Sequence, residues 1–207
     1  MSADKVQRVE NDTAQRILAA ALQIFLEKGY SAATTRAIAE LADVNEVTLF
    51  RHFGSKKNLL TAVVERYSPL KGLIALLSEQ LTGDFYQDLR ALSDYIVHSM
   101  AEQPDIMRLV LFESHQIPEL RDMLDFIPQQ IIRLLTDYFT QQTLSGTLRS
   151  DLHPTLIAQT FFGFFATFGV GVRMRQERNL DMTISVEMAQ AQLLEMFLHG
   201  VTPNDST

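Results

Sequence analysis

The 207-residue sequence contains no cysteine and no tryptophan. Without cysteine, neither a disulfide framework nor a thiolate metal site can form, and this absence is compatible with a reducing cytoplasm. No segment alternates with a period of two, and no internal repeat or low-complexity stretch appears. The first ten residues are polar and charged, so we expect no signal peptide and a cytoplasmic protein.

The sequence also lacks the patterns of common catalytic and metal sites. No Ser-His-Asp order, glycine-rich phosphate loop or HExxH run is present, so we expect neither an enzyme nor a cofactor. Among the five histidines, His98 has Glu102 one turn away but no third ligand within reach along the sequence. We therefore expect no metal site.

The composition is that of an ordinary soluble globular protein, with 46% hydrophobic and 21% charged residues, enough for one large or two modest domains. Apolar residues recur at helical spacing throughout, which predicts an all-α fold. A capping box of Asp12 and Gln15 opens the first helix, and Gly29 closes it. The helix before Ser68-Pro69 must end, kink or restart there, so we expect about nine helices, or ten segments if those on the two sides of Pro69 are counted separately. They are predicted at about 12–29, 35–42, 45–53, 55–67, 69–81, 84–102, 104–116, 119–143, 153–176 and 184–199.

Residues 34–59 are the most informative part of the chain, because they predict two short helices joined by a tight turn. Thr35 is a suitable N-cap for the first helix, and small Ala39 lies where the two helices must cross. Asp43 then occupies the turn, where a left-handed backbone is needed and Asp tolerates it better than most residues. A helix pair of this length fits the major groove of DNA.

The second helix of this pair is the candidate recognition helix. Asn45 can cap it, and Leu49 and Phe53 face inward, which leaves the other side chains for solvent or for a groove. In the next helix, Ser55 is the predicted cap and Lys56 lies in the first turn. Backbone N–H groups and a cation then point the same way and make an anion site suited to a DNA phosphate.

This region resembles the DNA-binding domain of the TetR family of bacterial transcriptional repressors. The resemblance implies a helix-turn-helix DNA-binding domain at residues 1–54 and a helical ligand-binding and dimerisation domain at 55–207. The matching positions are Gly29-Tyr30, Thr34-Thr35, Ile38-Ala39, Ala42-Asp43-Val44, Asn45, Thr48-Leu49-Phe50, His52-Phe53, Ser55-Lys56 and Leu59. The residues expected to contact DNA are Thr34, Thr35, Arg36, Asn45, Glu46, Val47, Thr48, Phe50, Arg51, His52, Ser55 and Lys56.

The departures from the family pattern redistribute the expected contacts. Asp43 replaces the turn glycine, and Phe50, in place of a tyrosine, has no hydroxyl for a phosphate. His52 and Arg51 can supply such contacts instead, His52 more strongly if protonated. Glu46 stands where a lysine or another polar residue is frequent. It is either a capping charge that lowers nonspecific affinity or an acceptor for a cytosine amino group.

The net charge of −7 is unevenly distributed along the chain. Residues 1–67 carry nine basic and eight acidic side chains, whereas the remainder carries nine basic and seventeen acidic ones. Because residues 68–207 are acidic and residues 1–67 are nearly neutral, the charge of the chain directs its N-terminal region toward DNA. It also predicts modest nonspecific affinity for DNA.

Residues 156–172 are apolar around the whole helix circumference, which indicates burial on all sides. The run is shorter than the about 20 residues of a membrane span, so we expect burial in protein and no membrane. With the last helix, it could form a four-helix bundle between two subunits, which is also how the family dimerises. The expected dimer contacts are Gly163, Thr167, Val170, Met188, Ala191, Leu194 and Leu198.

Large, adaptable side chains from residue 100 onward are candidates for an effector pocket of the kind that the resemblance implies. Plain core packing is the alternative for each of them. The candidates are Met100, Met107, Phe112, His115, Met123, Phe126, Phe161 and Phe165.

The sequence thus predicts a homodimeric, ligand-responsive repressor of a palindromic DNA operator. The alternative is a small-molecule-binding helical protein or enzyme in which the helix-turn-helix is incidental. The largely apolar lining predicts a largely apolar effector.

Overall fold

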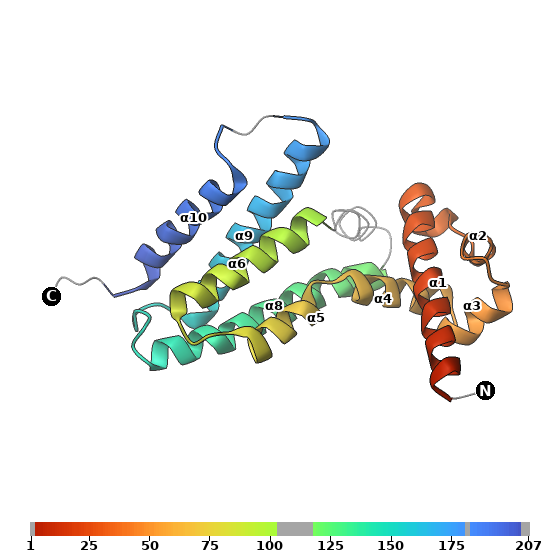
Figure 1. Ribbon diagram of the computed structural model, residues 1–207, viewed down its shortest axis with the longest axis horizontal. Coiled ribbons are helices and arrows are strands. Elements are labelled where there is room, and N and C mark those ends of the chain that lie inside the picture. Colours follow the sequence, from red (N-terminus) through yellow and green to blue (C-terminus); the bar gives the residue numbers. More distant parts are fainter. Residues whose placement is uncertain (1–2, 103–117, 181–182, 204–207) are drawn as a thin grey trace. The chain divides into compact units, whose positions relative to one another are not determined.

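The computed structural model describes residues 3–102, 118–180 and 183–203, and every element in these ranges is a helix (Figure 1). The all-α prediction is therefore confirmed. The predicted helix at 104–116 lies outside the described residues. The elements are α1 (Ala3–Ala32), α2 (Thr35–Leu41), α3 (Glu46–Phe53), α4 (Lys56–Tyr67), α5 (Leu70–Ala75), the π-helical η1 (Leu76–Gln80), α6 (Phe85–Glu102), α8 (Pro118–Leu144), α9 (Pro154–Glu177) and α10 (Val186–Val201).

The described residues fall into two compact units, which we call the head and the body. The head holds residues 3–68 and 118–125, and the body holds the rest. Although the functional boundary was predicted after Gly54, α4 belongs to the head because it packs against α1 and buries an apolar face that includes Leu59. Whether DNA binding is confined to residues 1–54 stays a prediction.

Apolar residues at helical spacing on α1 to α4 form the core of the head. α1 packs against both α2 and α4, and α3 also packs against these two helices. α3 is therefore supported on one side and exposed on the other. The buried side chains of this core include Ile17, Ala21, Phe25, Ile38, Leu49, Leu59 and Val63.

The start of α1 differs from the prediction. The helix begins at Ala3, so Asp12 lies in its interior and is not part of a capping box. Asp12 instead pairs with Arg16 one turn later, with 3.6 Å between Oδ2 and Nε, and such an i, i+4 pair is compatible with a helix interior. The predicted break at Gly29 is confirmed: its φ of 73° and ψ of 159° are not helical, and glycine adopts such angles without a steric cost.

The core of the body is built around α6 and α9, which make the most extensive contact between two elements. They cross closely at Gly169, where a Cβ atom would lie 2.6 Å from the carbonyl oxygen of Val97. Beside the crossing, the ring of Phe161 packs on Phe165 and Phe197, with centroid distances of 4.8 and 5.1 Å. Close backbone approach and interlocked rings together fill this interior.

The predicted helix at 69–81 is divided into α5 and η1. The hydroxyl of Tyr95 on α6 donates a hydrogen bond to the carbonyl oxygen of Pro69 at 2.6 Å. Gly72 lies so close to the Tyr95 ring that a Cβ atom there would clash with it. Tyr95 therefore holds the first turn of α5 against α6.

The two faces of α9 have different surroundings within the body. Phe161, Phe165 and Val172 on the inner face are buried, whereas Phe164 and Val170 on the outer face are exposed. Among the described helices, α9 is the one long and apolar enough to cross a membrane by length and composition, with a mean hydropathy of 1.5. Burial of the inner face shows how part of this apolar surface is used by the fold.

Candidate DNA-binding surface

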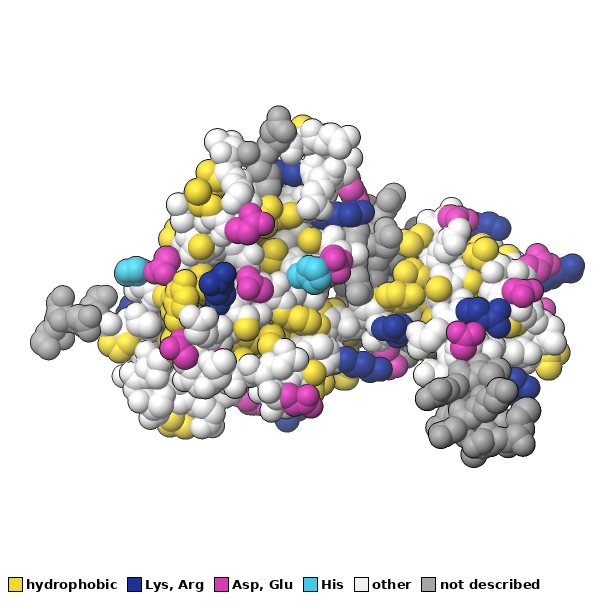
Figure 2. Space-filling view, in the orientation of Figure 1, with side chains coloured by type: hydrophobic (Ala, Val, Ile, Leu, Met, Phe, Trp, Pro, Cys, Tyr) yellow, Lys and Arg dark blue, Asp and Glu magenta, His cyan; other side chains and the backbone are white. Residues whose placement is uncertain are grey.

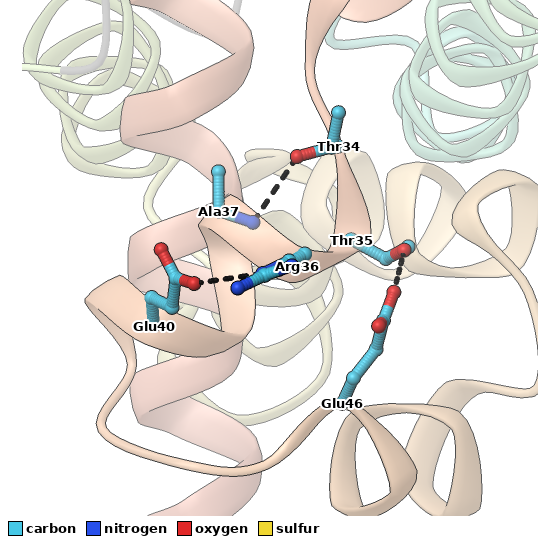
Figure 3. A network of polar contacts seen from close by, with 6 residues as sticks. All are labelled: Thr34, Thr35, Arg36, Ala37, Glu40 and Glu46. Carbon is cyan, nitrogen blue, oxygen red and sulfur yellow. Dashed lines mark hydrogen bonds and ion pairs between the residues drawn. The ribbon is translucent and has the colours of Figure 1, made fainter.

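The N-cap of α2 is Thr34, not Thr35 as predicted. The Thr34 hydroxyl oxygen accepts a hydrogen bond from the backbone N–H of Ala37 at 3.1 Å (Figure 3). Thr34 has an extended backbone, as an N-cap requires, whereas Thr35 is the first helical residue. Two adjacent threonines are equally good caps by residue type, so residue type alone does not distinguish Thr34 from Thr35.

Thr35 instead connects α2 to the recognition helix. Its hydroxyl donates a hydrogen bond to the carboxylate of Glu46, in the first turn of α3 (Figure 3). A carboxylate at this position also interacts favourably with the helix dipole. Of the two interpretations of Glu46, this contact favours the capping charge, because one carboxylate oxygen is already hydrogen-bonded within the head.

Arg36 lies on the exposed side of α2 and forms an ion pair with Glu40, with 3.0 Å between Nε and Oε1 (Figure 3). Both side chains are largely exposed, and such pairs contribute little to stability. Arg36 can therefore exchange Glu40 for a phosphate oxygen at a small cost.

The turn between the helices has the predicted geometry. Asp43 has a φ of 52°, in the left-handed region. Arg16 on α1 supports the turn, since its Nη1 donates to the carbonyl oxygen of Ala42 at 3.0 Å and lies 4.0 Å from the Asp43 carboxylate. The guanidinium thus supplies a donor at the C-terminal end of α2, where carbonyl groups lack helical partners.

The recognition helix α3 begins and faces as predicted. Asn45 caps it by accepting from the N–H of Thr48 at 2.7 Å. Leu49 is fully buried, whereas Val47 and Arg51 are exposed. The side of α3 that carries Val47 and Arg51 therefore faces outward from the head.

His52 does not present both ring nitrogens to solvent. Its Nε2 atom is buried and has no hydrogen-bond partner among the described residues. The ring lies beside that of Phe53, with 6.1 Å between centroids. A phosphate contact from His52 in this rotamer therefore has to use Nδ1.

The start of α4 combines a cap with a restrained lysine. Ser55 accepts from the N–H of Asn58 at 3.0 Å, which confirms the predicted cap. The Lys56 ammonium lies 4.4 Å from the centre of the Tyr30 ring and donates to the carbonyl oxygen of Ser31 at 3.4 Å. Burial lowers the pKa of Lys56 from its ordinary value. The lysine is thus held at the head surface rather than freely extended.

The predicted effector residues do not all lie in one place. Met100, Phe161 and Phe165 are buried in the body core, whereas Phe126 is 56% exposed. The side chains of Met107, Phe112, His115 and Met123 lie outside the described residues.

The predicted dimer residues are mostly on the outer surface of α9 and α10. Met188 is 53% exposed, and a Cβ built on Gly163 would have no contact within 4 Å among the described residues outside its own turn of α9. Leu194 is the exception, because it is buried within the body at 2% exposure and has little surface to offer a partner. Thr167, Val170 and Ala191 are exposed, and Leu198 is half-buried.

A paired α2 and α3, with one buried and one outward face on α3, is the arrangement of a helix-turn-helix DNA-binding protein. Residues 17–63 match the family of bacterial regulatory proteins described as the tetR family. The chain is 32% identical over 156 residues to the uncharacterized HTH-type transcriptional regulator YvkB of Bacillus subtilis, covering 74% of this chain and 81% of YvkB. The chain therefore belongs to the TetR family and is a DNA-binding transcriptional regulator, as predicted; the relatives are regulators and not enzymes.

Other relatives extend the similarity over nearly the whole chain. The HTH-type transcriptional regulator UidR of Escherichia coli is 23% identical over 96% of this chain and 97% of its own length. SmeT, solved as a complex with triclosan, matches with a TM-score of 0.72 at 20% identity over 93% of each chain. FadR of Bacillus subtilis, solved with stearoyl-CoA, matches with a TM-score of 0.69 at 20% identity over 90% of this chain and 98% of its own. The last two similarities establish the fold.

Proposed function

We propose that this regulator is a homodimeric repressor that binds a palindromic operator and releases it when a small, largely apolar ligand binds the body. The observation that carries the proposal is the outer face of α3, on a helix supported by both α2 and α4. In helix-turn-helix proteins, residues near the start of such a helix reach base edges in the major groove. Val47, Thr48 and Arg51 are the proposed base contacts.

The remaining proposed DNA contacts surround this face and position it. Arg36 and Lys56 would approach phosphates, and the capping residues Thr34, Asn45 and Ser55 would fix the helix starts there. Phosphate contacts carry no sequence information but set the register of the head on the duplex. Glu46 and Thr35, which bind each other, would contribute mainly by holding α2 and α3 together.

The exposed faces of α9 and α10 support a homodimer. A shallow hollow of about 670 Å³ lies over the outer face of α9 and is lined in part by Gly163, Thr167 and Leu193 of α10. An exposed apolar surface of this kind favours covering by another chain. Two helices from each of two copies would form a four-helix bundle, with Leu194 packing inside each body and not in the interface.

A largely apolar ligand agrees with the side chains of the body interior. Phe161 and Phe165 on α9 and Met100 on α6 are buried in the body, and large flexible or aromatic side chains can rearrange around an apolar molecule. Triclosan and stearoyl-CoA, the molecules solved with SmeT and with FadR, are consistent with this ligand class.

The acidic side chains of the body are spread over the face in view and not gathered at one place (Figure 2). Together with the larger acidic count beyond residue 67, this distribution keeps the body from attracting DNA by charge alone. Binding should therefore depend on the head and show modest nonspecific affinity.

DNA selection from a randomised duplex pool with the full-length protein tests the proposed operator. Because a dimer related by a two-fold axis places its recognition helices in successive major grooves, roughly 34–36 Å apart or more, we expect inverted half-sites. Footprinting then defines the protected region. Selected sequences without an inverted repeat would contradict the two-fold arrangement.

Size measurements on two variants of Gly163 test the proposed dimer interface. Gly163→Trp adds a large side chain to the open outer face and should shift the protein toward monomer, whereas Gly163→Ala should leave the dimer intact. Sedimentation analysis distinguishes the two species. A monomeric wild-type protein, or a Gly163→Trp dimer of unchanged stability, counts against this interface.

A screen of apolar and aromatic compounds tests the ligand. A compound that releases the selected duplex must bind one conformation more tightly than another. Phe165→Ala should raise the concentration needed for release and leave the affinity for DNA without ligand nearly unchanged. Equal damage to DNA binding and to release would show that Phe165 is plain core.

A further inference from the structure

The outer face of α3 carries two apolar side chains that water covers in the free protein. Val47 is 78% exposed, and Phe50 is 42% exposed. They lie three residues apart on one helix, so they are neighbours on the same face. Single exposed apolar residues are common on protein surfaces, but two adjacent ones on a helix that is proposed to enter a groove indicate an apolar contact there.

Polar side chains next to Val47 are already engaged within the head. The Glu46 carboxylate accepts a hydrogen bond from the Thr35 hydroxyl, and the Asn45 side chain accepts from the N–H of Thr48. Neither side chain can turn toward a base without losing its present hydrogen bond. Val47, next to Glu46 at the start of α3, instead presents a largely exposed side chain.

We propose that Val47, with Phe50 beside it, reads thymine through its C5-methyl group in the major groove. This inference rests on the proposed contact between α3 and DNA. The major-groove edges of base pairs present hydrogen-bond donors and acceptors, and the thymine methyl is the apolar group among them. A valine against that methyl removes apolar surface of both partners from water. Against the amino group of cytosine, the same side chain would desolvate a polar group without pairing it.

The position of Val47 places this contact near the start of the helix. It is the second residue of α3, within the N-terminal part that contacts base edges in helix-turn-helix proteins. Arg51 lies one turn further along the same face, so a guanine or a phosphate next to the thymine would meet a cation. Each half-site should therefore contain at least one thymine whose methyl group contributes to binding.

Removal of single methyl groups from DNA tests the proposal. The probe is the duplex that the full-length protein selects from a randomised pool, and each thymine is replaced in turn by deoxyuridine, which keeps its hydrogen-bonding groups. We expect one or two positions per half-site at which wild-type affinity falls about fourfold, the ratio that corresponds to burial of one methylene-sized group. With Val47→Ala, the loss at those positions should nearly disappear.

The comparison of protein and DNA changes is a double-mutant cycle, so it isolates the contact itself. Leu41→Ala, which shortens an exposed apolar side chain on α2, is the matched control and should leave the deoxyuridine losses unchanged. Thermal unfolding should show that both variants remain folded.

The outcomes separate this inference from the proposed function. If the protein selects a sequence but no deoxyuridine position weakens binding, or if Val47→Ala shows the same losses as wild type, then Val47 does not read thymine and operator binding still stands. If no sequence is selected at all, the proposed function itself is wrong.

Discussion

The head and the body use apolar residues in opposite ways. The head buries them in a small core, and its candidate DNA-binding surface lies on short helices that are each capped. The side chains of Thr34, Asn45 and Ser55 each accept a hydrogen bond from a backbone N–H group. The body is built of longer helices, and α9 leaves several apolar side chains exposed after the core is filled. The comparison shows that a surface for DNA is positioned by local hydrogen bonds, whereas a surface for an apolar partner is what remains after packing.

The largest expected effects on unfolding free energy come from substitutions in the cores of the head and of the body. Phe161→Ala removes a ring that packs on Phe165 and Phe197, and Leu49→Ala removes the buried contact of α3. We expect losses in unfolding free energy of about 3–5 kcal/mol for the phenylalanine and about 2–5 kcal/mol for the leucine. Denaturant unfolding measures both values. If head and body unfold separately, each change should shift one transition and leave the other in place.

Two glycines on the same helix sharpen the contrast between inner and outer faces of α9. At Gly169 a methyl group would meet the backbone of α6, whereas at Gly163 it meets open space. Gly169→Ala should therefore destabilise the body by about 1–3 kcal/mol. Gly163→Ala should be neutral or stabilising, by at most about 1 kcal/mol, because alanine favours the helix. Equal effects in thermal unfolding would refute the assignment of the faces.

A smaller effect is expected where the first turn of α5 meets α6. Tyr95→Phe removes one hydrogen bond to the carbonyl oxygen of Pro69, which keeps its bond from the N–H of Leu73. The expected cost is about 0.5–1.5 kcal/mol, since the acceptor is not left unpaired. If this contact couples ligand binding in the body to the head, then the release of DNA by ligand should change more than the affinity for DNA without ligand. Titrations of DNA binding with and without a releasing compound distinguish these cases.

The smallest effect concerns the turn of the head. Asp43→Gly removes the strain of a left-handed aspartate, roughly 1–2 kcal/mol for an ordinary residue and less for Asp, but adds about 0.5–1 kcal/mol of chain entropy. We expect a net gain of about 0.5 kcal/mol or less, with DNA affinity unchanged. Denaturant midpoints measure it. A clear loss of stability would show that the 4.0 Å approach of Arg16 to Asp43 contributes more than its distance indicates.

The sequence alone determined local features that depend on residues close together along the chain. Asn45, Ser55 and Asp43 act within three or four residues of themselves, and the apolar period of each helix is likewise local, so these two caps and the turn followed from residue type, whereas the start of α1 and the N-cap of α2 did not. The signature at residues 29–59 then predicted the family, which the comparisons confirmed.

Only the tertiary structure decided features that join distant residues. Thr35 and Glu46 are eleven positions apart, and their hydrogen bond depends on how α2 and α3 cross. Leu194 is buried and Phe126 exposed although both are large and apolar, because residue type does not say which helix face meets a neighbour. Hydrophobic burial is non-directional, so a sequence specifies that such side chains seek cover, while the packing of whole helices decides which of them find it.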